Sequence, residues 1–89
     1  MIERAIVIPN RLGLHARAAA RFVRLASEYQ STVQLRMGNR SVNGKSLLDV
    51  LTLAASQGTE LTLIVEGMDE KDAADAIENL IADKFEEDA

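Results

Sequence analysis

The feature that most restricts the fold of this chain is the switch of its apolar pattern between two periods over short distances. Val33–Met37 alternates apolar and polar residues strictly, which is typical of a half-buried strand. The segment from Ala16 to about Tyr29 instead has the three- and four-residue spacing of one helical face. The inward positions of this predicted helix are Ala19, Phe22, Val23 and Ala26. Elements this short must share one layered core of sheet and helices.

Turn signals separate the remaining predicted elements. The other strands are Ile2–Ile8, which Pro9 stops, Arg40–Asn43 and Leu61–Val65. One further helix runs from Ser46 to about Leu53, and Asp69 caps the last. The inward face of that last helix is Ala73, Ala74, Ile77, Leu80, Ile81 and Phe85. The tail, residues 86–89, is expected to fray.

The order of these elements is β-α-β-β-α-β-α. It predicts an α+β fold, a split βαβ open-faced sandwich with three helices on one face of a four-stranded, mainly antiparallel sheet. The length of 89 residues predicts a single domain, 1–89. With no cysteine and one histidine, disulfides and a structural zinc site are excluded. We expect a cytoplasmic protein, since no signal peptide or membrane-spanning segment is evident.

Charge is divided unevenly between the two halves of the chain. Residues 1–45 hold eight basic and two acidic residues, a net charge of +6, and residues 46–89 carry −10. The total of −4 argues against a general nucleic-acid binder. The basic half is suited to steering an anionic partner or substrate.

The start of the first predicted helix carries the chemistry. His15 stands at the cap position, where Ser, Thr, Asp or Asn is usual, and alanines fill the first turn. We therefore expect the N–H groups of Ala16, Arg17 and Ala18 to be free, as an anion site at the positive end of the helix dipole. The Arg17 guanidinium fits phosphate oxygens, and Arg21 and Arg24 extend a basic stripe.

A nucleophilic imidazole beside an anion cradle is suited to phosphoryl transfer. Physical reasoning alone leaves plain alternatives open: a surface histidine, a solvated arginine face, and alanines chosen for helix propensity. An RNA-binding or metal-carrying domain of this shape fits poorly. The three aromatic residues fall in predicted helices, and paired cysteines are missing.

Three separated motifs add a resemblance. They are Gly13-Leu14-His15-Ala16-Arg17, Lys45-Ser46-Leu47-Leu48 and Gln57-Gly58-Thr59. Together, over nearly the whole chain, they resemble the HPr family, the histidine phosphocarriers of the bacterial phosphoenolpyruvate-dependent phosphotransferase system.

The resemblance implies that His15 receives phosphate on Nδ1 from enzyme I, passes it to an enzyme IIA-type acceptor, and is assisted by Arg17. It implies no cofactor, no metal and no enzymatic turnover by the chain itself. Ser46 resembles the residue modified by HPr kinase/phosphorylase in some members. The implied partner-binding residues are Leu14, Ala20, Arg21, Arg24, Leu47, Leu48 and Leu51.

Two positions depart from the usual family pattern. Ala18 stands where most members have proline, so it keeps an N–H donor. Leu12 is more similar to the nitrogen-branch paralogue NPr than to sugar-type members. A nitrogen-branch carrier, and a non-catalytic interaction domain that uses Leu47 and Leu48, therefore stay open as alternatives. Ser46 also has a plain structural role, because Ser46-x-x-Asp49 is a capping-box pattern.

Overall fold

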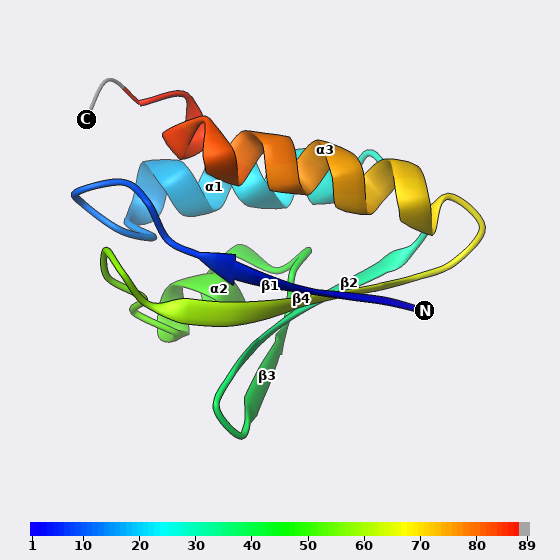
Figure 1. Ribbon diagram of the computed structural model, residues 1–89, viewed down its shortest axis with the longest axis horizontal. Coiled ribbons are helices and arrows are strands. Elements are labelled where there is room, and N and C mark those ends of the chain that lie inside the picture. Colours follow the sequence, from blue (N-terminus) through cyan, green and yellow to red (C-terminus); the bar gives the residue numbers. More distant parts are fainter. Residues whose placement is uncertain (88–89) are drawn as a thin grey trace.

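The computed structural model describes residues 1–87 and has one antiparallel sheet covered by helices (Figure 1). The strands are β1 (Ile2–Val7), β2 (Thr32–Met37), β3 (Arg40–Asn43) and β4 (Glu60–Glu66). The helices are α1 (Ala16–Ala26), α2 (Leu47–Thr52) and α3 (Glu70–Ala82), followed by the single turn η1 (Lys84–Glu86). The predicted fold class and element order are confirmed.

The sheet order is β1-β4-β2-β3, and every neighbouring pair is antiparallel. The register places Ile2 opposite Val65 and Leu35 opposite Leu63, so apolar residues line up on the inner face of the sheet. Helices α1 and α3 lie side by side over this face, and α2 packs against α1 and β3 (Figure 1). Among residues 1–87, no helix is long and apolar enough to cross a membrane.

Several predicted boundaries needed correction. Helix α1 ends at Ala26 and not near Tyr29, because the N–H groups of Glu28 and Tyr29 bond to carbonyls only three residues back in a tightening turn. The inward face of this helix includes the fully buried Ala18, which was not predicted there, whereas Val23 is only half-buried. The strand β4 is one residue longer at each end than predicted.

Asp69 occupies the N-cap position of α3, but its side chain does not cap the helix. The carboxylate accepts hydrogen bonds from the N–H groups of Gln30 and Ser31, both at 2.9 Å, and from the Ser31 hydroxyl at 2.5 Å. These bonds, that from the Ser31 hydroxyl foremost, hold the pKa of Asp69 below its usual value. Asp69 therefore ties the start of α3 to the turn after α1.

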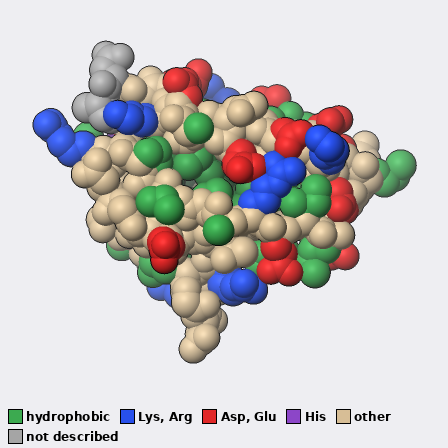
Figure 2. Space-filling view, viewed as in Figure 1, with side chains coloured by type: hydrophobic (Ala, Val, Ile, Leu, Met, Phe, Trp, Pro, Cys, Tyr) green, Lys and Arg blue, Asp and Glu red, His purple; other side chains and the backbone are tan. Residues whose placement is uncertain are grey.

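The charge separation of the sequence is partly cancelled in three dimensions. Arg4 of β1 donates to Asp75 of α3 at 2.7 Å and to Glu78 at 2.5 Å, and Lys71 also pairs with Asp75. Red and blue side chains accordingly lie next to one another where α3 covers the sheet (Figure 2). Arginines of α1 are absent from these pairs, so the basic surface that remains includes the start of α1.

Candidate functional site

The loop before α1 is built to hold His15 in place. Gly13 has a φ of +66°, and a Cβ atom there would lie 2.5 Å from the carbonyl oxygen of Ala55, so only glycine fits without a shift. The next residue, Leu14, donates its N–H to that same oxygen at 2.8 Å. Asn10 is fully buried and donates from Nδ2 to the Gly13 carbonyl at 2.7 Å. The loop is thus fixed at two points directly before the histidine.

His15 caps α1 with its ring. Its backbone is extended, with φ −74° and ψ 177°, its carbonyl accepts from Ala19 N–H, and Nδ1 accepts from Arg17 N–H at 3.3 Å. The expectation of three free N–H groups is therefore wrong for Arg17, because the imidazole nitrogen reaches it as a capping asparagine oxygen would. Within residues 1–87, Ala16 N–H and Ala18 N–H have no acceptor. The lone pair of Nδ1 consequently points at the N-terminus of the helix.

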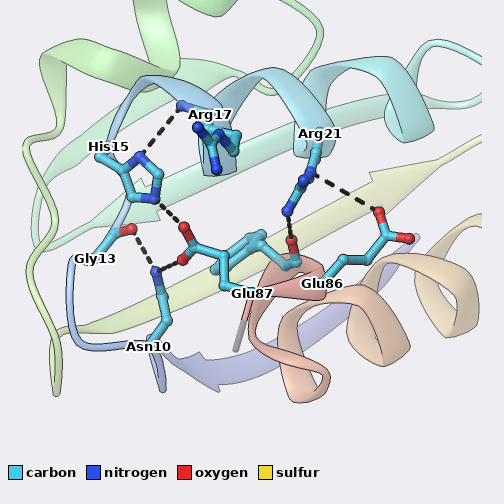
Figure 3. A network of polar contacts seen from close by, with 8 residues as sticks. Asn10, Gly13, His15, Arg17, Arg21, Glu86 and Glu87 are labelled. Atoms are coloured by element: carbon cyan, nitrogen blue, oxygen red, sulfur yellow. Dashed lines mark hydrogen bonds and ion pairs between the residues drawn. The ribbon is translucent and has the colours of Figure 1, made fainter. Parts of the chain in front are cut away.

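The other ring nitrogen meets the C-terminal segment of the described chain (Figure 3). His15 Nε2 is hydrogen-bonded to Glu87 Oε2, and the second oxygen of Glu87 accepts from Asn10 Nδ2 at 2.7 Å. Burial alone would raise the pKa of Glu87, but the hydrogen bonds from His15 and Asn10 outweigh it and hold this pKa below its usual value. The Glu87 side chain is only 12% exposed. The predicted fraying is thus wrong for Glu87, while Asp88 and Ala89 lie outside the described residues.

A left-handed turn brings Glu87 to this position. Lys84, Phe85 and Glu86 have φ values of 55°, 55° and 65°, so the chain reverses direction after α3. Phe85 was predicted on the inward face of that helix. It is fully buried, but in this turn instead. Arg21 of α1 donates to the Phe85 carbonyl at 2.6 Å, so it fastens the turn beside the site.

The arginines expected to form one stripe have different surroundings. Arg17 and Arg24 are exposed, and within residues 1–87 neither guanidinium has a hydrogen-bonded or ion-paired partner. Arg21 is half-buried, bound to the Phe85 carbonyl and 4.0 Å from a Glu86 oxygen. The free positive charge next to His15 therefore comes from Arg17, whereas Arg21 is mainly structural.

Only some of the apolar residues expected at a docking surface reach the exterior. Leu48 is 76% exposed and Leu47 39%; Ala20 is exposed and Leu51 half-buried. Leu14 is 4% exposed, so its side chain belongs to the core and is not at that surface, because the bond from its N–H to Ala55 turns it inward. Sequence reasoning did not assign Leu12 to this surface, although it is 65% exposed.

Ser46 caps the short helix α2, as its sequence pattern predicted. Its hydroxyl accepts from Asp49 N–H at 3.3 Å. The neighbouring Lys45 donates from Nζ to the Tyr29 carbonyl at 2.7 Å. The capping role of Ser46 is confirmed.

The contacts of the imidazole assign its neutral tautomer. A carboxylate can only accept, so Nε2 carries the proton, and the N–H of Arg17 requires a lone pair on Nδ1. Sequence reasoning missed the two residues that fix this state, Asn10 and Glu87. The available signal was Phe85, a large apolar residue within an acidic tail, which had to anchor that tail. In the described part of the chain no group of three or more His, Asp or Glu side chains is placed to hold a metal ion.

Comparisons with known proteins point to one family. A family model described as the PTS HPr component phosphorylation site matches residues 2–83. The phosphocarrier protein HPr of Xylella fastidiosa is 43% identical over 88 residues, with 99% of each chain covered. That of Pseudomonas aeruginosa is 47% identical over 83 residues, with 92% of each covered. The crystal structure of HPr from Thermoanaerobacter tengcongensis has a TM-score of 0.96 and 43% identity, and all of both chains is covered.

Proposed function

Because the chain belongs to the HPr family of phosphocarriers of the phosphotransferase system, we propose that it carries a phosphoryl group on Nδ1 of His15. Phosphorylated enzyme I is the donor, and an enzyme IIA-type domain of sugar uptake or its regulation is the acceptor. The chain is a stoichiometric intermediate that needs no cofactor.

The observation that carries this proposal is the direction of Nδ1. The Nδ1 lone pair faces the N-terminus of α1, where Nδ1 lies 3.3 Å from Arg17 N, while Nε2 is hydrogen-bonded to Glu87. In the transfer, the lone pair forms the Nδ1–P bond, and the bond from phosphorus to the donor breaks with its electron pair leaving on the donor. The same exchange in reverse hands the group to the acceptor.

The N-terminus of α1 can neutralise the charge of a phosphoryl group bound to Nδ1. Once Nδ1 bonds to phosphorus, Arg17 N–H loses its acceptor and can donate to a phosphoryl oxygen instead. The N–H groups of Ala16 and Ala18 point from the same turn, and the Arg17 guanidinium is available from the exposed side. Donors that are already aligned reduce the reorganisation that the transfer requires.

We propose that the partners dock on the apolar surface formed by Ala20, Leu47, Leu48 and Leu51, together with the charge of Arg24. These residues come from α1 and α2, which pack against each other. A small apolar surface with a basic edge is suited to transient contacts, which a carrier needs because it must leave after each transfer.

Modification of Ser46 by an HPr kinase/phosphorylase belongs to this proposal as a regulatory step. Because the hydroxyl caps α2, a phosphate there would displace that hydrogen bond and meet the negative charge of Asp49. Mass spectrometry of peptides containing Ser46 from cells would detect it. Recovery of only unmodified Ser46 peptides under every growth condition would remove this step.

The test is phosphorylation with phosphoenolpyruvate and enzyme I, with His15→Ala and Ser46→Ala as variants. We expect one acid-labile phosphoryl group on wild type and Ser46→Ala, and none on His15→Ala. Phosphate appearing undiminished on His15→Ala would refute the carrier role and favour the non-catalytic interaction domain. Running sugar-type and nitrogen-type enzyme I in parallel assigns the branch, because the cognate donor should react faster.

A further inference from the structure

We infer that Glu87 is a positioning residue for the His15 reaction, an inference that rests on the proposed carrier function. Its side chain holds the proton on Nε2, keeps Nδ1 unprotonated so that its lone pair can bond to phosphorus, and stabilises the charge that the ring acquires on phosphorylation. The observations that lead to it are the contacts of Glu87, the anchoring of the C-terminal turn, and the orientation of Asn10 (Figure 3).

The fold holds the Glu87 carboxylate firmly beside the ring. Glu87 bonds to His15 Nε2 with one oxygen and to Asn10 Nδ2 with the other. The turn before it consists of three consecutive non-glycine residues with positive φ, a conformation that persists only where the surroundings impose it. Burial of Phe85 and the bond from Arg21 to its carbonyl supply that constraint. The position of the Glu87 carboxylate beside the His15 ring is thus imposed by the packing of the turn before it.

Asn10 makes the site selective for a carboxylate. Its Nδ2 donates both to the Gly13 carbonyl and to Glu87, while its Oδ1 is buried without a partner among residues 1–87. Flipping the amide would set Oδ1 against the Gly13 carbonyl oxygen, so this orientation is fixed. Residue 87 must therefore accept from Asn10 and also accept from Nε2. A carboxylate can do both, and an amide cannot.

The transfer changes the charge of the ring next to Glu87. A neutral ring with its proton on Nε2 gains a positive charge when Nδ1 forms its bond to phosphorus, and the electron pair of the broken donor bond leaves with the donor. No proton has to move. The hydrogen bond between Nε2–H and the Glu87 carboxylate then joins two opposite charges instead of a neutral donor and a charged acceptor, so it stabilises the phosphorylated ring more than the free ring.

The test combines a tautomer measurement with a rate. Nitrogen-15 NMR of His15 in its neutral form identifies the protonated nitrogen, and quench-flow with phosphorylated enzyme I gives the transfer rate. We compare wild type, Glu87→Gln and Glu87→Ala. The matched control is Glu86→Gln, which removes the same charge one residue away from a side chain that is 64% exposed.

In wild type and Glu86→Gln we expect the proton on Nε2. In Glu87→Gln, the amide oxygen must face Asn10, so its NH₂ faces Nε2 and drives the ring towards the tautomer with the proton on Nδ1. Transfer should then slow by about tenfold to a hundredfold, the range of one hydrogen bond to a charged group. Glu87→Ala should give a mixture of tautomers and an intermediate rate.

The inference is overturned if the tautomer of Glu87→Gln equals that of wild type. It is equally overturned if the tautomer changes while the transfer rate does not, or if Glu86→Gln slows transfer as much as Glu87→Gln. Failure of the carrier proposal is distinguishable, because wild type would then accept no phosphate at all. The tautomer comparison still tests the contact in that case.

Discussion

Replacement of Gly13 by alanine should be the most costly small change in the loop that carries His15. Gly13 has a φ of +66°, which is unfavourable for alanine. The added methyl group would lie 2.5 Å from the Ala55 carbonyl oxygen and 2.8 Å from Ser56 Cα, both of which are backbone atoms. We assign about 1–2 kcal/mol to the left-handed conformation. Displacing Ala55 adds about 1 kcal/mol or more, because the bond from Leu14 N–H is lost. The total is about 2–4 kcal/mol.

Gly38→Ala is the matched control for this prediction. Gly38 has nearly the same φ, +62°, but nothing lies within 4 Å of its added Cβ. It should cost only the conformational part, about 1–2 kcal/mol. Urea unfolding followed by circular dichroism measures both variants, and the difference between them isolates the close approach of Gly13 to Ala55. Equal losses of unfolding free energy in the two variants would refute the reasoning.

Phe85→Ala should lower the unfolding free energy by about 3–5 kcal/mol. The NMR shifts of His15 should also change in this variant, because the turn that carries Glu87 is released. Phe85→Leu should keep most of the stability and nearly the wild-type shifts. Asp69 has a lowered pKa in the folded protein, so its contribution to the free energy of unfolding is present above the unfolded pKa and is lost as pH falls through the folded pKa. The difference in unfolding free energy between wild type and Asp69→Asn should therefore shrink in acid. A difference that does not change with pH would contradict this. Ala18→Pro removes an N–H that has no acceptor among residues 1–87. We therefore expect the free energy of unfolding, measured by thermal unfolding, to rise by about 0.5 kcal/mol. A decrease would show that the proline ring does not fit this buried position.

The elements that could be predicted from sequence are those whose pattern is local. Arg40–Asn43 was predicted with the observed bounds, and Val33–Met37 differs from β2 by one residue, because alternation and turn glycines encode them directly. The place of His15 at the start of α1 and the cap at Ser46 were also predicted, since both depend on a few neighbouring residues, but the hydrogen bond from Arg17 N–H to the His15 ring was not predicted.

What could not be predicted depends on contacts between distant parts of the chain. The carboxylate of Asp69 follows the rule for a helix cap, yet the backbone of Gln30 and Ser31 offers better donors once α1 and α3 pack together. Likewise, Lys84–Glu86 contains no glycine to indicate a left-handed turn. The position of Glu87 beside His15 follows from that turn, so the second half of the site was not evident in the sequence.

The central claim is that Nδ1 of His15 is the atom that takes the phosphoryl group. Phosphorus-31 and nitrogen-15 NMR of the phosphorylated protein, labelled in its single histidine, tests it most directly. We predict a phosphorus–nitrogen coupling to Nδ1, with the proton retained on Nε2. A coupling to Nε2, or phosphate found only on a serine, would contradict the account.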